Sequence, residues 1–271
     1  MPTLHIIIPA YNEAATIEAC LQRVTAAELP AGWVMSITIV DDCSTDGTGD
    51  QVERIIHDSE TLPCAMTLLR HDVNRGKGAS LQTGFDAVLA NPPTNGEQSA
   101  DDIVIIQDAD LEYDPADYAS LMQPLIEDAA DAVFGTRWGA HFATDGAWRR
   151  LHAFGNRSLT MLSNLLTGYR ISDMECCYKL MPVTWLRRIR PSLSEERFGI
   201  EPQIAAALGR CNARLVERPV SYSPRDVGSG KKIGWRDAAR AVWVIGRERF
   251  RSTPGSMRGS ARRSTYESNT P

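Results

Sequence analysis

Residues 103–112 of the chain are Ile-Val-Ile-Ile-Gln-Asp-Ala-Asp-Leu-Glu. The apolar run at the start of this stretch has no alternating polar positions, which is typical of a strand buried on both faces of an α/β sheet. Acidic residues follow where the strand would end, at Asp108, Asp110 and Glu112. Because ligands of open α/β sheets bind at the carboxyl ends of the strands, this stretch predicts an α/β fold with a polar site at that edge.

The acidic residues of this stretch indicate a bound cation. Two carboxylates two residues apart repel one another and lose hydration unless a cation or a proton lies between them. A hard divalent ion such as Mg²⁺ or Mn²⁺ takes oxygen ligands from carboxylates and phosphates, and it would remove that cost. The alternative is a solvated acidic turn before a helix that Asp114-Pro115 opens, and the stretch alone leaves both interpretations open.

Strand and helix patterns on either side extend the same architecture. Short apolar runs predict further strands at residues 4–8, 36–40, 66–69, 132–135 and 214–220. Helical patterns separate most of these runs, and this alternation is typical of a parallel, nucleotide-binding type of sheet. Apolar residues at helical spacing within 148–166 predict a helix that faces the core.

Composition limits the classes of function. The 271 residues are 43% hydrophobic and 23% charged, as in an ordinary soluble globular protein with a full core. The net charge of −5 argues against a nucleic-acid partner, because neutralising phosphates needs a basic face. The six cysteines show no paired metal-type spacing and we find no signal peptide, so we expect reduced thiols and a cytoplasmic protein. No apolar run approaches the roughly 20 residues of a membrane span.

Six short motifs occur in order along the chain. They are Ile-Pro-Ala-Tyr-Asn-Glu (8–13), Val-Asp-Asp-Cys-Ser-Thr-Asp-Gly-Thr (40–48), Asn-Arg-Gly-Lys-Gly (74–78), Asp-Ala-Asp-Leu-Glu (108–112), Gly-Thr-Arg (135–137) and a late Arg225 followed by Lys231. With these motifs the chain resembles glycosyltransferase family 2, and within it the catalytic domain of dolichyl- and polyprenyl-phosphate sugar synthases. The resemblance runs from about Leu4 to Arg249. Where many of those synthases have Asp-x-Thr-Gly, this chain has Asp-Met-Glu-Cys at 173–176, which leaves the acceptor open.

The resemblance implies an α/β GT-A fold, with a central, mostly parallel sheet flanked by helices. We expect one glycosyltransferase domain over residues 1–251. Residues 1–135 would form its nucleotide-sugar-binding half and residues 136–251 its acceptor half. From residue 252 to 271 the composition is dominated by Ser, Arg, Gly and Pro, so we expect a disordered tail.

The resemblance also implies roles for individual residues. The nucleotide base and ribose would be held by Pro9, Tyr11, Glu13, Val40 and Asp42. The metal ligands would be Asp108, Asp110 and Glu112, and Ala109 would approach the nucleotide. Arg137 would contact the acceptor phosphate or the donor diphosphate. Arg225 and Lys231 would reach the donor from a loop, residues 224–232, that closes over it. The set expected to act in catalysis is Asp108, Asp110, Arg137, Arg225 and Lys231.

The implied activity is an inverting, metal-dependent transfer of a hexose. The donor would be a nucleotide-diphosphate sugar of the GDP-mannose or UDP-glucose type, the cofactor Mg²⁺ or Mn²⁺, and the acceptor a polyprenyl or dolichyl phosphate. A glycosyltransferase with a soluble or polymeric acceptor, and a nucleotide-sugar-binding protein without activity, are alternatives. A nucleotidyltransferase would need a Gly-rich basic loop directly after the first strand, which Pro9-Ala10-Tyr11 does not supply.

Residues 235–250 carry apolar side chains at helical spacing with arginines among them. Two interpretations stay open for this helix. It could lie on an anionic membrane surface, with Trp235, Trp243 and Phe250 at the headgroup boundary and the arginines facing lipid. It could instead pack on the domain core, as apolar helical stripes usually do. The first interpretation makes the protein a peripheral one at the inner face of the membrane.

Overall fold

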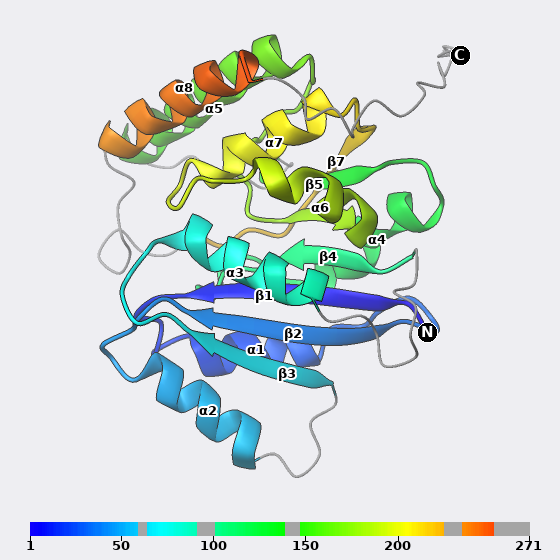
Figure 1. Ribbon diagram of the computed structural model, residues 1–271, viewed down its shortest axis with the longest axis vertical. Helices are drawn as coiled ribbons and strands as arrows, with labels where there is room; N and C mark the ends of the chain where they lie inside the picture. The colour runs from blue at the N-terminus through cyan, green and yellow to red at the C-terminus, as the bar shows by residue number, and fades with distance from the viewer. Residues whose placement is uncertain (59–63, 91–100, 139–146, 225–234, 252–271) are drawn as a thin grey trace.

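The computed structural model describes residues 1–58, 64–90, 101–138, 147–224 and 235–251 (Figure 1). Within these residues the centre is a seven-stranded sheet of order β3-β2-β1-β4-β6-β5-β7. Its strands are β1 (Thr3–Ala10), β2 (Val34–Asp41), β3 (Ala65–Arg70), β4 (Ile103–Ile106), β5 (Ala132–Thr136), β6 (Lys179–Pro182) and β7 (Leu215–Pro219). The α/β fold and the five predicted strands flanking β4 are confirmed.

One strand of this sheet runs against the others. β1, β2, β3 and β4 pair in parallel, and β5 pairs in parallel with β7. β6 is inserted between β4 and β5 and is antiparallel to both. The sequence analysis did not predict β6, because its four residues begin with a lysine and end with a proline and so lack the continuous apolar run of β4. The amino end of β6 therefore lies at the edge where its parallel neighbours have their carboxyl ends.

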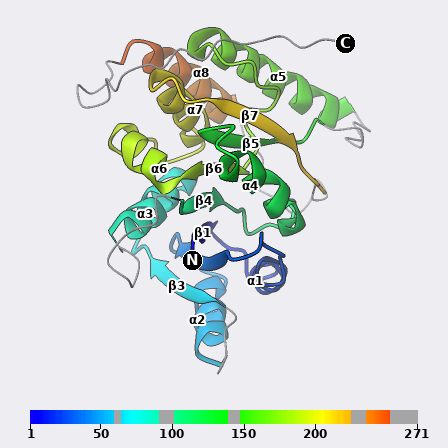
Figure 2. The same ribbon diagram turned by 90° about the vertical axis from the view of Figure 1, so that its right-hand side faces the viewer.

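Helices cover both faces of the sheet (Figure 2). They are α1 (Ile17–Thr25), α2 (Thr48–Asp58), α3 (Lys77–Ala90), α4 (Tyr118–Ile126), α5 (Ala147–Thr167), α6 (Val183–Ile189), α7 (Ile200–Arg210) and α8 (Trp235–Arg249), with short 3-10 turns at Pro115–Asp117 and Arg190–Ser192. In Figure 2, α3 and α6 lie on one side of the sheet and α1 and α4 on the other. This two-sided cover explains why all four residues of β4 are buried.

Helix α1 begins at Ile17. The residues before it form a turn, in which the backbone N–H of Glu13 donates to Thr48 Oγ1 at 2.8 Å. The backbone N–H of Ala14 donates to Asp46 Oδ2 at 3.0 Å. These bonds to another part of the chain replace the helical ones, and they fix the end of β1 against the turn that follows β2.

Helices α5, α7 and α8 form an outer layer beyond β5 and β7 (Figure 1). On α8, the side chains of Ala241, Val244, Ile245 and Glu248 are buried, so one face of this helix packs on the domain. Large apolar side chains on the outside of α5 and α8 are exposed, and we call this set the α5–α8 apolar surface: Phe154, Met161, Leu165, Val242, Trp243 and Phe250. The leucines of the predicted α5 stripe whose side chains are described, Leu159, Leu162 and Leu166, are partly buried and pack against the core as expected, and the exposed large apolar residues of α5 lie outside that stripe.

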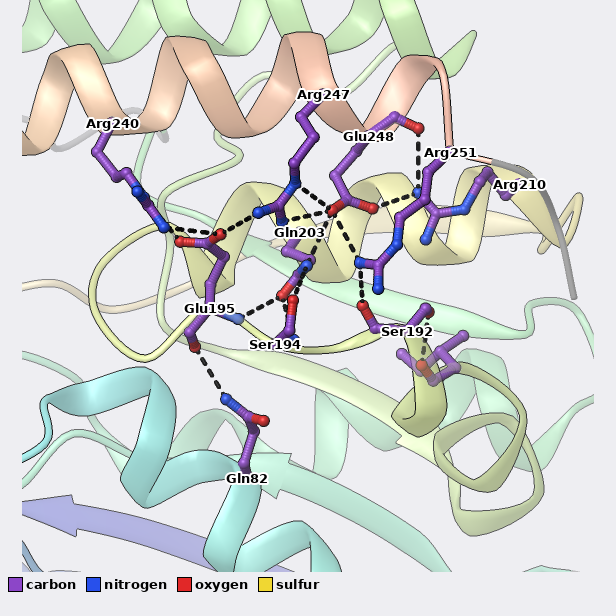
Figure 3. A network of polar contacts seen from close by, with 11 residues as sticks. Gln82, Ser192, Ser194, Glu195, Gln203, Arg210, Arg240, Arg247, Glu248 and Arg251 are labelled. Atoms are coloured by element: carbon purple, nitrogen blue, oxygen red, sulfur yellow. Dashed lines mark hydrogen bonds and ion pairs between the residues drawn. The ribbon is translucent and has the colours of Figure 1, made fainter.

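Buried glutamates tie α8 to the rest of the domain (Figure 3). Glu195 accepts from Arg240 Nε at 3.0 Å and pairs with Arg247 Nη1 at 2.8 Å. Glu248 pairs with Arg247 Nη2 at 2.7 Å and with Arg210 Nη1 at 2.6 Å. The expectation that the α8 arginines face lipid is wrong for Arg240 and Arg247, because buried carboxylates at these distances already bind their guanidinium groups.

Several predictions fall on other parts of the chain. Arg225, Lys231, nearly all of the 224–232 loop and the 252–271 tail lie outside the described residues, as do the side chains of Trp235 and Arg236. None of the helices in the described parts of the chain combines the length and the apolar character that a membrane span requires.

Candidate active site

The candidate site lies at the edge where the parallel strands end. The turns after β1, β2, β3 and β4 bring Glu13, Asp42, Lys77 and Asp108 to this edge. Since β6 is antiparallel, its first residue, Lys179, comes to the same edge from the second half of the chain. The sheet thus gathers the predicted nucleotide and metal residues together with cations that the sequence analysis did not include in the site.

Asp108 is bound to a lysine ammonium. Lys77 Nζ lies 2.8 Å from Asp108 Oδ1 and 3.0 Å from Asp108 Oδ2. The same nitrogen is 3.1 Å from Glu201 Oε1 at the start of α7, and Lys179 binds the other oxygen of Glu201. Burial alone would lower the pKa of Lys77, but the negative charges of Asp108 and Glu201 and the hydrogen bond to Asp108 hold that pKa well above its ordinary value. Lys77 is therefore a permanent cation here.

Asp42 binds the turn that carries Lys77. The backbone N–H groups of Arg75 and Gly76 donate to its two carboxylate oxygens, at 2.9 Å and 2.6 Å. His71 Nδ1 lies 2.7 Å from Asp42 Oδ1. The sequence analysis placed a nucleotide against Asp42 and Val40, and this stays a prediction. In the structure Val40 is fully buried, and Asp42 acts as the anion at the start of α3.

Glycines let this turn approach a neighbouring loop. Gly76 has φ of 101°, a left-handed conformation that side chains other than glycine rarely adopt. A Cβ on Gly78 would collide with the carbonyl oxygen of Glu195. The backbone N–H of Ala79 donates to Glu196 O at 2.9 Å, so α3 begins directly on this loop. The Gly-Lys-Gly sequence is needed for this close contact between the two halves of the chain.

The turn after β1 is also held in place. Pro9 is half-buried and Tyr11 is exposed, while Asn12 adopts φ of 56°. The backbone N–H of Asn12 donates to Ser44 Oγ at 2.9 Å. Glu13 Oε2 accepts from Thr16 Oγ1 at 2.8 Å. Pro9, Tyr11 and Glu13 thus come to the same edge as Asp108, as their predicted role in nucleotide binding requires.

The acidic residues after β4 provide hard oxygen ligands but do not form a closed cage. Asp110 Oδ1 accepts from the backbone N–H of Glu112 at 3.1 Å, and Glu112 Oε2 accepts from the Tyr222 hydroxyl at 2.9 Å. Among the described residues, no three acidic, histidine or cysteine side chains could together hold a metal ion. Mg²⁺ commonly takes only one or two carboxylates and completes its shell with substrate phosphates and water. Asp108 and Asp110 fit a site of that kind, and the metal-ligand role expected for these two residues and for Glu112 stays a prediction.

Arg137, at the end of β5, is paired with a buried acid. Its Nε and Nη2 each lie 2.7 Å from an oxygen of Asp173, and its backbone N–H donates to the same carboxylate at 3.0 Å. Its guanidinium also lies over the ring of Tyr222, 5.4 Å from the ring centre. The predicted phosphate contact of Arg137 would therefore be made by a group that Asp173 already orients.

Glu175 is close enough to both the Arg137–Asp173 pair and the Lys179–Glu201 pair for their charges to act on its pKa. Its Oε1 is buried and has no hydrogen-bond partner in the structure. Burial is the main cause that raises the pKa of this carboxyl to about 7, and the charge of Glu201 adds to it, although Lys179 and Arg137 act in the opposite direction. Glu175 is thus a carboxyl group that gains and loses its proton near neutral pH.

The sequence profile described as glycosyl transferase family 2 matches residues 5–190. The chain belongs to this family. As a member it is a glycosyltransferase, which confirms the activity class that the sequence motifs implied.

Curated relatives of this glycosyltransferase include enzymes named for polyprenyl phosphates. An undecaprenyl-phosphate mannosyltransferase of Micrococcus luteus is 25% identical over 231 residues, which is 84% of this chain and 86% of the relative. An undecaprenyl-phosphate 4-deoxy-4-formamido-L-arabinose transferase of Pseudomonas aeruginosa is 29% identical over 239 residues. That match covers 85% of this chain but only 60% of the relative, so the arabinose transferase is a longer protein.

A solved structure shares the fold of this glycosyltransferase. The glucosyl-3-phosphoglycerate synthase of Mycobacterium tuberculosis, in complex with Mn²⁺, uridine diphosphate and phosphoglyceric acid, superposes with a TM-score of 0.63. The match covers 92% of this chain and 79% of the synthase, at 16% sequence identity. A likeness at this identity concerns the fold, and it confirms the predicted GT-A fold.

The sequence analysis did not predict five residues of the site, namely Lys77, Asp173, Glu175, Lys179 and Glu201. Lys77 entered the sequence analysis only as part of the Asn-Arg-Gly-Lys-Gly motif. A sequence signal existed for Asp173 and Glu175, since two acids stand beside the Cys176-Cys177 pair in an otherwise apolar stretch. Nothing in the local sequence around Glu201 indicates that α7 begins at the same edge of the sheet.

Proposed function

We propose that this glycosyltransferase moves a hexose, with inversion, from a nucleotide-diphosphate sugar to a polyprenyl phosphate. The donor class is supported by the polar residues at the sheet edge, where Lys77 binds Asp108 and Asp110 follows two residues later in the same turn. The acceptor class is supported by the relatives named for undecaprenyl phosphate.

The chemistry at the donor is charge stabilisation. When the sugar leaves, negative charge develops on the nucleoside diphosphate. A divalent cation held by Asp108 and Asp110 would supply Lewis-acid stabilisation of that charge. Arg137 would add a cation whose direction Asp173 fixes, and the turn of residues 11–13 would hold the base and ribose. Arg225 and Lys231 would contact the donor from the loop of residues 224–232, as the sequence analysis predicted.

A phosphate acceptor does not need a general base from the protein. Its oxygen is already ionised at neutral pH and can attack the sugar carbon without losing a proton. A soluble or polymeric acceptor would attack through a hydroxyl group, which needs a general base with a pKa near the working pH. Glu175 has such a pKa, about 7, and it lies in the acceptor half of the chain. This residue is the one observation that favours transfer to a hydroxyl acceptor as the second candidate function.

We also propose that the α5–α8 apolar surface brings the enzyme to the membrane that holds its acceptor. Phe250 is 89% exposed and Leu165 is 79% exposed, although water disfavours such large apolar groups. An amphipathic helix can bury this kind of face at the headgroup boundary, and the opposite face of α8, with Ala241, Val244 and Ile245, stays packed on the protein. The contact would be apolar in character, because Arg240 and Arg247 are bound by Glu195.

The test is a transfer assay with defined acceptors. The protein is incubated with GDP-mannose or UDP-glucose and Mn²⁺, with either undecaprenyl phosphate or soluble hydroxyl acceptors. We expect nucleoside diphosphate release that depends on the lipid phosphate, with labelled sugar in the organic phase. Release that rises only with a hydroxyl acceptor, and that is lost in Glu175→Gln, would support the second function instead. No stimulation by any of these acceptors contradicts both.

A further inference from the structure

The ammonium group of Lys77 contacts both carboxylate oxygens of Asp108, the first acid of the Asp-Ala-Asp motif. Its ammonium nitrogen lies 2.8 Å from Oδ1 and 3.0 Å from Oδ2 of Asp108, so it stands where a cation shared by both oxygens would stand. Its third contact is Glu201 Oε1 at 3.1 Å. An ammonium that already holds Asp108 competes with any other cation for the same carboxylate.

The ion pairs around Lys77 differ in burial. At one end, the Lys179 side chain is fully buried and the Glu201 side chain is 3% exposed, so the pair between them is sealed inside the protein. At the other end, the Asp108 side chain is 23% exposed and therefore within reach of solvent. Separating a buried pair leaves uncompensated charges, whereas a pair at the surface can exchange partners. Of the two acids that bind Lys77, Asp108 is therefore the one that can exchange the ammonium for another cation.

The turn that carries Lys77 is fixed independently of Asp108. Asp42 binds the backbone N–H groups of Arg75 and Gly76, and Gln82 Nε2 donates to Glu195 O at 3.0 Å. The backbone of residue 77 is thereby held in place, and only the flexible stem of its side chain is free to rotate. The ammonium can leave Asp108 without any change in the fold, and Glu201 stays within its reach.

We infer that Lys77 is a positioning residue which holds Asp108 in the metal-free enzyme and gives it up to the divalent cation, keeping its ion pair with Glu201. This inference rests on the proposed metal-dependent function. Lys77 lowers the affinity of the site for a metal ion, since the ion must displace an ammonium. Glu201 raises that affinity, since it retains the displaced cation. Removing the two side chains should therefore change metal affinity in opposite directions.

The experiment is a Mn²⁺ titration followed by the electron paramagnetic resonance signal of free Mn²⁺, which requires no turnover. Lys77→Met should bind Mn²⁺ about ten-fold more tightly than the wild type, because a competing charge at contact distance is gone. Lys77→Arg, which keeps a cation, should stay near the wild type. Glu201→Gln should bind Mn²⁺ several-fold more weakly. Melting temperatures establish which variants are folded. If only one of Lys77→Met and Glu201→Gln is folded, its Mn²⁺ affinity is sufficient to test the inference.

The outcomes separate this inference from the proposed function. If the wild type binds Mn²⁺ and Lys77→Met binds it equally or more weakly, the displacement model is wrong while the metal site stands. The same holds if Glu201→Gln tightens binding. A wild type that binds no Mn²⁺, with or without UDP or GDP, overturns both the inference and the proposed metal dependence. A purely structural role for Lys77 would lower the melting temperature of Lys77→Met without tightening Mn²⁺ binding.

Discussion

Arg137 and Asp173 form a two-point ion pair in which Nε and Nη2 of the arginine each lie 2.7 Å from a carboxylate oxygen. The Asp173 side chain is fully buried, and Arg137 comes from the end of a different strand. A lysine could not make this planar contact, because its single ammonium lacks the forked geometry of a guanidinium. The pair therefore fixes the stretch before β6 against β5, in addition to any role at the site.

We predict that Arg137→Met destabilises the protein by about 3 kcal/mol, because it leaves the buried Asp173 carboxylate without its charge partner. Asp173→Asn should destabilise it less, and the double variant should lose less stability than the two single variants added together. Urea unfolding of the four proteins measures this coupling. If the effects add to within about 0.5 kcal/mol, the two residues do not stabilise one another.

The metal requirement predicts a large effect of Asp110→Asn. Removing one carboxylate of a metal site that bridges a phosphate should lower turnover on the order of 10²-fold or more. Asp114→Asn is the matched control, because Asp114 is exposed and an asparagine oxygen can still accept from the backbone N–H of Ala116. The measurement is nucleoside diphosphate release with Mn²⁺ and with a chelator. Full activity of Asp110→Asn in the chelator would refute the metal role.

Glu175 predicts a dependence of stability on pH. Its pKa is raised from 4.5 to about 7 in the folded protein, so between these values the folded state holds a proton that the unfolded chain has lost. The contribution of Glu175 to stability therefore falls as pH rises through this interval and is lowest above pH 7. Glu175→Gln, which is neutral at every pH, should gain up to roughly 3 kcal/mol over the wild type at pH 8 and little at pH 4.5.

Thermal unfolding of both proteins from pH 4.5 to 8 measures this difference, and the exposed Glu28 provides the control substitution, Glu28→Gln. The control should follow the wild type at every pH. A melting-temperature difference between Glu175→Gln and the wild type that does not change with pH would show that Glu175 is ionised like an ordinary surface glutamate.

The α5–α8 apolar surface predicts binding to lipid vesicles. Leu165→Ser combined with Phe250→Ser should weaken sedimentation with phosphatidylglycerol vesicles at least several-fold, because each removes an apolar side chain from the lipid contact. The melting temperature should hardly change, since both side chains are exposed. Val73→Ser combined with Ile126→Ser removes two exposed apolar side chains elsewhere and should not affect binding. Equal sedimentation of both double variants and the wild type would argue against this surface as the contact.

Substitution of the α8 arginines should act on the fold instead. Arg240→Glu together with Arg247→Glu places two acids beside the buried Glu195 and Glu248, so we expect a melting temperature lower by several degrees. Circular dichroism on heating measures it. An unchanged melting temperature would mean that the network in Figure 3 contributes nothing to stability.

The sequence by itself determined the class of fold and the edge that carries the site. The apolar run of β4 is typical of a buried strand, and the acids after it then lie at the carboxyl end of that strand. Glu13 and Asp42 also follow predicted strands, and parallel strands send the residues that follow them to one edge of the sheet. Periodicity and short motifs were sufficient for this, since each depends on neighbours in the chain.

Only the tertiary structure decided which charges meet. β6 is antiparallel, and this reversal brings Lys179 to the edge where the other strands end. Glu201 reaches Lys77 because α7 begins on the loop that Gly78 allows to approach. Likewise, the sequence analysis assigned no partner to Arg240 and Arg247 of α8, and both are bound by Glu195, which is buried in the segment before α7. Ion pairs of this kind join residues distant in sequence, so they depend on strand order and burial, which no local pattern encodes.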